Sequence, residues 1–98
     1  MDIRKTQNGT ELMIELEGRL DTTTAPELEK ELNISLDGVT ALTLDFAGLE
    51  YLSSAGLRVL LSAQKTMNRQ GSMKVIHVNE KIQKIFEVTG FAEILTIE

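Results

Sequence analysis

The sequence predicts a single α/β domain, spanning residues 1–98, built on a mixed sheet of four to five strands. Segments with a two-residue alternation of apolar side chains are followed by segments with helical spacing, and the two kinds alternate along most of the chain. Asn8-Gly9, a pair suited to a two-residue turn, joins the first two strands into a hairpin. A length of 98 residues allows one hydrophobic core but not two. The expected order is ββαβαβα, with three main helices and room for a final edge strand.

The first two strands are expected at residues 3–7 and 11–17 and should pair antiparallel. In the second strand apolar residues alternate with more polar ones, which predicts one buried face. Gly18 is expected to end this strand, and residues 19–23 are expected to form a polar loop. That loop leads into the first helix.

The first helix is expected to begin near Thr24. The Thr24 hydroxyl can accept from the first amide groups, Glu27 can reach back, and Pro26 is tolerated in the first turn. Asp37-Gly38 should close this element. The following apolar alternation predicts a strand over residues 41–46.

The second half of the chain predicts a longer helix, a strand and a third helix. Helical spacing of apolar residues follows Ser53-Ser54 and stops at Gln70-Gly71. Residues 73–78 are interpreted as a central strand. Asn79 can cap a third helix that Gly90 ends, and residues 94–97 can add the edge strand. Strands joined through helices are expected to be parallel neighbours.

Composition excludes several classes of function. Ten Lys and Arg against fifteen Asp and Glu give a net charge of −5, which does not favour binding to nucleic acid. The chain has no Cys and one His, so disulfides, thiolate metal sites and paired-histidine sites are excluded. No apolar run approaches the length of a membrane span, and no signal peptide is recognised. We expect a cytoplasmic protein without a cofactor, a metal or a catalytic site.

Two loops at the carboxyl ends of strands are the candidate site, because ligands and partners meet open α/β sheets there. One loop carries residues 21–23 and the other carries Ser53 and Ser54 at a helix start. On spacing alone, a serine in this position is more often a helix cap. The functional interpretation is that a phosphate on it would meet the positive end of the helix dipole, with Arg58 one turn further on.

Other residues give weaker signals. His77 is expected within a strand and is interpreted as structural. Asp21 and Asp45 could share a metal or a proton, but isolated aspartates at strand ends are more often caps and turn formers. A polar stripe on the second helix is by default solvated, although it could face an acidic partner. The stripe consists of Arg58, Ser62, Lys65 and Arg69.

Several segments, in this order, resemble the STAS domain family. Gly18-Arg19-Leu20-Asp21 resembles the approach to its first helix, and residues 44–57 resemble its central signature, an apolar strand followed by a "D-S-x-G-L" helix start. Residues 78–91 resemble its third helix with the "T-G" ending. The resemblance covers essentially the whole chain.

A stand-alone STAS domain of this length is similar to bacterial anti-sigma factor antagonists. The resemblance implies that the unphosphorylated protein binds an anti-sigma factor that is also a serine kinase, which frees the sigma factor. The kinase would phosphorylate Ser54, the partner would then dissociate, and a metal-dependent serine phosphatase would reset the switch. The docking surface that the resemblance implies contains Asp21, Thr22, Thr23, Ser53, Ser54, Ala55, Arg58 and Ser62.

One position departs from the family pattern. Ser53 stands where an Asp usually precedes the modified serine, and Ala55-Gly56-Leu57 fixes the alignment in favour of Ser54. Two other functions stay open at this point. The domain could be an accessory subunit of a membrane transporter, or the loops of Asp21 and Ser54 could hold a nucleotide or another small anion.

Overall fold

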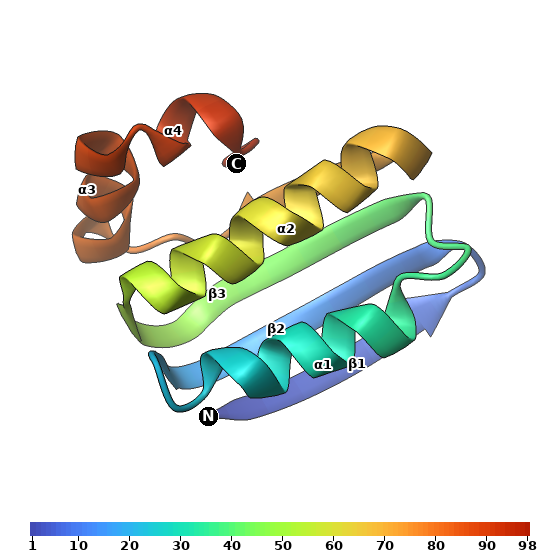
Figure 1. Cartoon of the computed structure of the whole chain (residues 1–98), viewed down its shortest axis with the longest axis horizontal. Coiled ribbons are helices and arrows are strands. Elements are labelled where there is room, and N and C mark those ends of the chain that lie inside the picture. The colour runs from blue at the N-terminus through green and yellow to red at the C-terminus, as the bar shows by residue number, and fades with distance from the viewer.

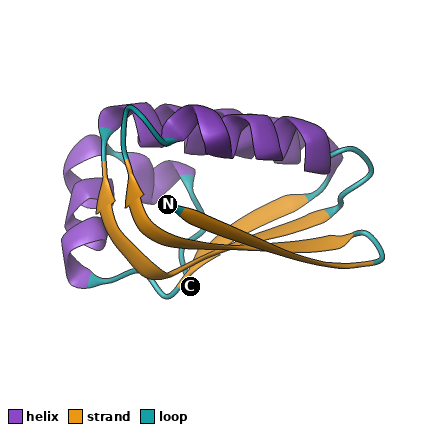
Figure 2. Ribbon diagram, turned by 90° about the horizontal axis from the view of Figure 1, so that it is seen from below, coloured by secondary structure: helices purple, strands orange, loops and turns teal.

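A computed structural model describes residues 1–98 as a four-stranded sheet with helices on one of its faces (Figures 1 and 2). The spatial order of the strands is β1-β2-β3-β4. β1 pairs antiparallel with β2, whereas β2, β3 and β4 are parallel neighbours. The strands are β1 (Asp2–Asn8), β2 (Glu11–Leu20), β3 (Ala41–Leu52) and β4 (Ser72–Ile76). The predicted mixed sheet and its hairpin are confirmed.

Two helices, α1 (Ala25–Ser35) and α2 (Ser54–Gln70), lie side by side over one face of the sheet, and Figure 2 shows the other face without a helix. α3 (Glu80–Thr89) and the short α4 (Phe91–Ile94) lie toward the end of the sheet where α2 begins. The three main helices are therefore confirmed, and α4 is an addition. None of these helices has the length and apolar composition needed to cross a bilayer.

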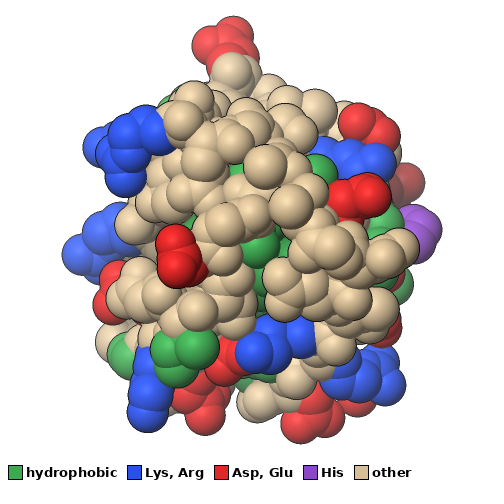
Figure 3. Space-filling model, turned by 90° about the vertical axis from the view of Figure 1, so that its right-hand side faces the viewer, with side chains coloured by type: hydrophobic (Ala, Val, Ile, Leu, Met, Phe, Trp, Pro, Cys, Tyr) green, Lys and Arg blue, Asp and Glu red, His purple; other side chains and the backbone are tan.

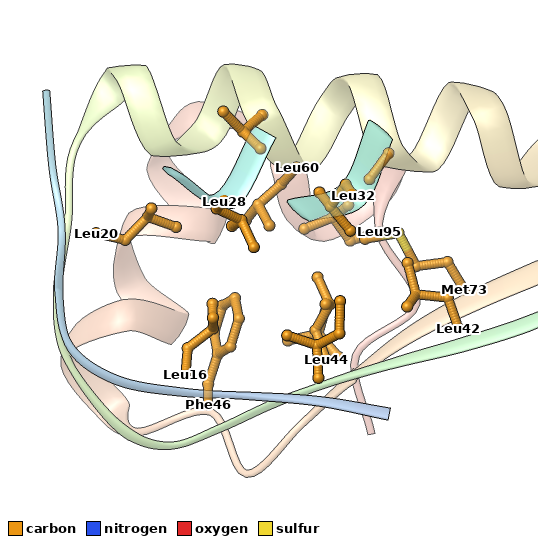
Figure 4. Close-up of a cluster of buried hydrophobic side chains, with 14 of the residues drawn as sticks. Leu16, Leu20, Leu28, Leu32, Leu42, Leu44, Phe46, Leu60, Met73 and Leu95 are labelled. Atoms are coloured by element: carbon orange, nitrogen blue, oxygen red, sulfur yellow. The ribbon is translucent and has the colours of Figure 1, made fainter. Parts of the chain in front are cut away.

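The core lies between the sheet and the two covering helices. The predicted alternation in β2 is observed: Leu12, Ile14 and Leu16 are buried against the helices. β3 and β4 repeat the pattern in register, because Leu42 pairs with Leu12 on one side and Met73 on the other. Figure 4 shows this layer meeting leucines from α1 and α2. Burial of 24 apolar residues in one cluster orients the helices on the sheet.

Both long strands continue further than the sequence pattern indicates. Gly18 does not end β2; it takes a φ of +102° within the strand, and the pairing with β3 shifts register on either side of it. Pairing then resumes as far as Leu20 and Leu52. The predicted ends of these strands, at residues 17 and 46, are therefore wrong. The register shifts bend β2 and β3 together, and the two strands stay paired beyond the bend.

The prediction for residues 73–78 is also wrong in part. β4 ends at Ile76 and lies at the edge of the four-stranded sheet, not at its centre. His77 lies outside the strand in a left-handed conformation, with a φ of 58°. The expected edge strand at residues 94–97 is reduced to one parallel bridge between Val75 and Ile97, because α4 uses the preceding residues.

The helix ends follow their predicted signals with one exception. Asn79 caps α3 by accepting from the Ile82 N–H at 2.9 Å, and Gly90 ends it at a φ of 81°. Thr24 occupies the N-cap position of α1, but its side chain makes no capping hydrogen bond. The Thr24 hydroxyl instead donates to the Arg19 carbonyl at 2.8 Å, so it closes the preceding turn.

Candidate functional site

The carboxyl ends of β2 and β3 bring the two predicted loops together. The Ser53 N–H donates to the Leu20 carbonyl at 2.9 Å, which joins the two strand ends immediately before α2 begins. β2 leads into the turn at residues 21–24, and β3 leads directly into α2. The two candidate loops therefore lie next to each other at the same end of the molecule (Figure 1).

Asp21 organises the first loop. One of its carboxylate oxygens, Oδ1, accepts from the Thr23 hydroxyl at 2.8 Å, the Thr23 N–H at 3.0 Å and the Thr24 N–H at 3.2 Å. The hydrogen bond from the Thr23 hydroxyl is the largest cause that holds the pKa of Asp21 at about 2, below its ordinary 3.8, because donors stabilise the charged form. Asp21 is therefore ionised at neutral pH and fixes the loop that leads into α1.

Adjacent serines at the start of α2 have different surroundings. Ser53 is the N-cap: its Oγ accepts from the Gly56 N–H at 3.3 Å. Ser54 is the first helical residue, is exposed, and its hydroxyl makes no hydrogen bond to the protein. The capping role that spacing alone assigns to Ser54 belongs to Ser53, which leaves the Ser54 hydroxyl free to react.

Gly56 determines how closely α2 approaches the strand ends. A Cβ added to Gly56 would lie 2.7 Å from Cγ of Leu20 and 2.8 Å from Cδ1 of Leu52. Both leucines are buried, so neither can move aside freely. Only glycine allows this approach, and it places Ser54 and Ala55 beside the Asp21 loop.

An open groove of about 260 Å³ runs between the starts of α1 and α2. Its lining was only partly predicted: the sequence indicated Thr22, Ala55 and Arg58, but not the α1 side of the groove. The residues along the groove are Thr22, Ala25, Pro26, Glu29, Ala55, Arg58 and Val59. The contribution of α1 to the groove could have been predicted from the topology. Helices that connect consecutive parallel strands lie next to each other on the sheet.

The predicted docking residues occupy one end of the molecule and one face of α2. Thr22, Thr23, Ser54, Arg58 and Ser62 are exposed. The others, Asp21, Ser53 and Ala55, are half-buried. Ser62 lies eight residues beyond Ser54 in α2, roughly 12 Å along the helix axis at 1.5 Å per residue.

Asp45 and His77 form a separate pair. Nδ1 of His77 lies 2.9 Å from Oδ1 of Asp45, and Oδ1 also accepts from the Ala47 N–H at 2.9 Å. Burial alone raises the pKa of Asp45, but the bonds from Ala47 and His77 outweigh it and lower the pKa below its ordinary value. His77 is thus a partner of Asp45, and not a residue within a strand as predicted. No group of three or more His, Asp or Glu side chains is arranged to hold a metal ion.

The opposite end of the molecule has a different surface. Figure 3 views the side where α2 ends and the β1–β2 hairpin turns. Acidic and basic side chains are interspersed around its rim, and the centre consists mostly of backbone and of side chains that are neither charged nor hydrophobic. Neither one sign of charge nor a broad apolar patch gathers there.

The chain is similar in sequence to one family model and to several curated proteins. A family model described as "Mlab, STAS domain" matches residues 3–96. BtrV of Bordetella bronchiseptica, which is assigned as an anti-sigma factor antagonist, is 34% identical over 84 residues, covering 84% of this chain and 72% of the relative. The anti-sigma-B factor antagonist of Bacillus subtilis is 27% identical over 92 residues, covering 93% of this chain and 84% of the relative.

Solved structures agree in fold. The Bacillus anti-sigma factor antagonist SpoIIAA in its unphosphorylated form superimposes with a TM-score of 0.79 at 16% identity, covering 99% of this chain and 87% of that one. Its phosphorylated form gives a TM-score of 0.77 with 91% of that chain covered. At 16% sequence identity, these matches show that the proteins share a fold.

Proposed function

The chain belongs to the STAS domain family, and from that premise we propose that it is an anti-sigma factor antagonist switched by phosphorylation of Ser54. The observation that carries the proposal is the free, exposed Ser54 hydroxyl at the first residue of α2. Similarity to two named antagonists over most of the chain supports it. The protein acts in the cytoplasm by binding, not by catalysis.

In its unphosphorylated form the protein binds an anti-sigma factor and thereby frees the sigma factor. The docking surface combines the Asp21 loop with the start and exposed face of α2. It consists of Asp21, Thr22, Thr23, Ser53, Ser54, Ala55, Arg58 and Ser62, and it borders the groove between α1 and α2. The groove gives this surface a concave part, which a protruding segment of the partner can fill.

The anti-sigma factor is also the kinase that ends the interaction. Oγ of Ser54 attacks the γ-phosphorus of ATP, the bond from that phosphorus to the ADP oxygen breaks, and a base on the kinase takes the hydroxyl proton. A serine phosphatase later hydrolyses the ester and restores the hydroxyl. Ser53 is less suited to the reaction, because its Oγ accepts from the Gly56 N–H and is half-buried.

Added charge explains release without unfolding. A phosphate adds about −1.5 to −2 charges at pH 7, and in a docked complex this charge must be desolvated or repelled. About 1.4 kcal/mol of such cost weakens binding tenfold. In the free protein the same phosphate lies at the positive end of the α2 dipole, one turn from Arg58, so the fold tolerates it.

Substitutions at Ser54 test the proposal. The partner is the anti-sigma factor recovered with the protein from native cells, identified by mass spectrometry and then purified. Ser54→Ala should bind it as the parent does and should not respond to ATP. Ser54→Asp should keep the parent's melting temperature within a few degrees, since a carboxylate is favourable at a helix start, and should bind at least tenfold more weakly.

Ser62→Asp is the matched comparison, because it places the same charge on the docking surface about two turns of α2 beyond Ser54. It should weaken binding less than Ser54→Asp does. If folded Ser54→Asp bound the anti-sigma factor as tightly as the parent, Ser54 would be structural. The transporter-subunit function would then be favoured.

A further inference from the structure

Two cationic side chains, from β2 and α3, lie over one aromatic ring of β3 near the docking surface. Cζ of Arg19 in β2 lies 4.2 Å from the ring centroid of Tyr51 in β3. Nζ of Lys81, in the first turn of α3, lies 5.8 Å from the same centroid. Both distances fall within the range of cation–π attraction, about 6 Å. We call this group the Arg19–Tyr51–Lys81 cluster.

Neither cation of the cluster is fully neutralised. The Arg19 side chain is 59% exposed and reaches one carboxylate, with its Nε 3.5 Å from Oδ2 of Asp21. No carboxylate oxygen lies within 4.0 Å of the Lys81 ammonium. A guanidinium stacked on a ring by its flat face keeps N–H groups at its edge for a carboxylate. The cluster therefore offers an ammonium group without a carboxylate partner, on Lys81, and a guanidinium on Arg19 that contacts a single carboxylate through Nε.

The cluster is continuous with the proposed docking surface. The Arg19–Asp21 contact connects it to the first docking loop, and Tyr51 lies three residues before Ser54 in the chain. α3, which carries Lys81, lies at the end of the molecule where α2 begins (Figure 1). In a chain with a net charge of −5, the two cations at this ring outnumber the one carboxylate that contacts them.

We propose that the Arg19–Tyr51–Lys81 cluster is a second docking contact, which binds a carboxylate-bearing acidic segment of the anti-sigma factor. This inference rests on the proposed function. Tyrosine and arginine are enriched in interface hot spots, and an arginine already held against a ring loses less side-chain entropy when it docks. The contact with the Tyr51 ring restricts the Arg19 side chain before the partner arrives, and the positive charge accelerates association with an acidic segment.

Calorimetry with the purified anti-sigma factor tests the cluster. The unphosphorylated parent is compared with Arg19→Gln, Lys81→Gln and the control Lys84→Gln, which removes an exposed cation from the next turn of α3 without a Tyr51 contact. Arg19→Gln and Lys81→Gln should each weaken binding about five- to tenfold at low salt, while Lys84→Gln stays within about twofold. The losses should shrink at high salt, because ions screen partly exposed charges.

Each outcome separates the cluster from the Ser54 switch. Lys81→Gln leaves the Asp21 loop intact, so it reports on the cluster even if Arg19→Gln lowers the melting temperature. Equal losses in all three variants would reflect net charge and overturn the inference. Unchanged affinity in both cluster variants, with Ser54→Asp still weak, would overturn the inference alone. A parent protein that does not bind any anti-sigma factor would overturn the proposed function, and the inference with it.

Discussion

Ser53 and Ser54 are adjacent and have the same side chain, but only the Ser53 hydroxyl makes a hydrogen bond within the protein. The Ser53 hydroxyl is held by the Gly56 N–H at 3.3 Å, whereas Ser54 has no partner in the protein. A reaction at Ser53 would first break its cap, which is worth about 0.5–2 kcal/mol. A reaction at Ser54 costs no internal hydrogen bond.

We therefore expect the cognate kinase and ATP to add one phosphate, at Ser54. Mass spectrometry of a digested sample locates it. Ser53→Ala should still be phosphorylated, although with a melting temperature lowered by loss of the cap, and Ser54→Ala should not react. Phosphate found only on Ser53 would contradict the assignment.

At this scale, the sequence predicts residues that act through local geometry. The helix start at Ser53-Ser54 and the Asp21 turn could be predicted because helix starts and turn formers have short-range signals, whereas the choice of Ser54 as the modified serine came from the family resemblance. The same signals placed the cap at Thr24, but its hydroxyl closes the preceding turn and Asp21 accepts the amides. The Arg19–Tyr51–Lys81 cluster has no short-range signal, because it depends on how α3 returns to the strand ends.

Among the elements, α2 depends on its close contact with the two strand ends. Gly56→Ala adds a methyl group that would lie 2.7 Å from Leu20 Cγ and 2.8 Å from Leu52 Cδ1. Alanine is the better helix former by about 1 kcal/mol, but overpacking of a buried contact costs about 1–3 kcal/mol. We expect a net loss of stability in urea unfolding.

Ser62→Ala is the control for this prediction, since Ser62 is exposed on the same helix and its replacement creates no contact. It should leave the free energy of unfolding unchanged or slightly higher. A Gly56→Ala protein as stable as the parent would show that the strand ends can adjust. The close approach would then not determine the position of Ser54.

The exposed face of α2 is expected to contribute unevenly to docking. Arg58 lines the groove beside Thr22 and Ala55, whereas Lys65 lies seven residues further along, roughly 10 Å at 1.5 Å per residue. Arg58→Glu should therefore weaken partner binding more than Lys65→Glu does, as measured by calorimetry at one salt concentration. Equal losses, or a larger loss at Lys65, would shift the docking surface toward the end of α2.

Element types were predictable, and several of their ends were not. The positions of α2 and α3 follow from apolar spacing together with Gly71 and Gly90. β2 and β3 extend further than predicted because they continue to pair beyond the bend at Gly18. The local sequence pattern of one strand does not show where it pairs with another. β4 was expected at the centre because its residues are apolar, but α4 extends to Ile94 and the chain after it covers the outer edge of β4 only through a single bridge at Val75 and Ile97.

For the whole molecule, two carboxylates with lowered pKa values couple stability to pH. Asp21 acts at the strand ends, and Asp45 acts on β3 beside His77. A carboxyl group whose pKa is lower in the folded state than in the unfolded state stabilises the fold above its unfolded pKa. That contribution is lost as the pH falls through the folded value. For Asp21 the window runs from about 4 down to about 2.

The free energy of unfolding should therefore fall between about pH 4 and pH 2, and Asp21→Asn should remove part of this dependence. At pH 7 the variant lacks the charged acceptor of Thr23 and Thr24 and should be less stable than the parent. Near pH 2 the parent's Asp21 is itself partly protonated, so the difference in the free energy of unfolding between parent and variant should narrow as the pH falls.

Urea unfolding at pH 7, 5, 4 and 3 measures this gap in stability, with Asp37→Asn as a control because that exposed side chain makes no hydrogen bond. A gap that stayed constant from pH 7 to pH 3 would mean that the carboxylate charge of Asp21 contributes nothing to the fold. The loop would then be held by its backbone turn alone.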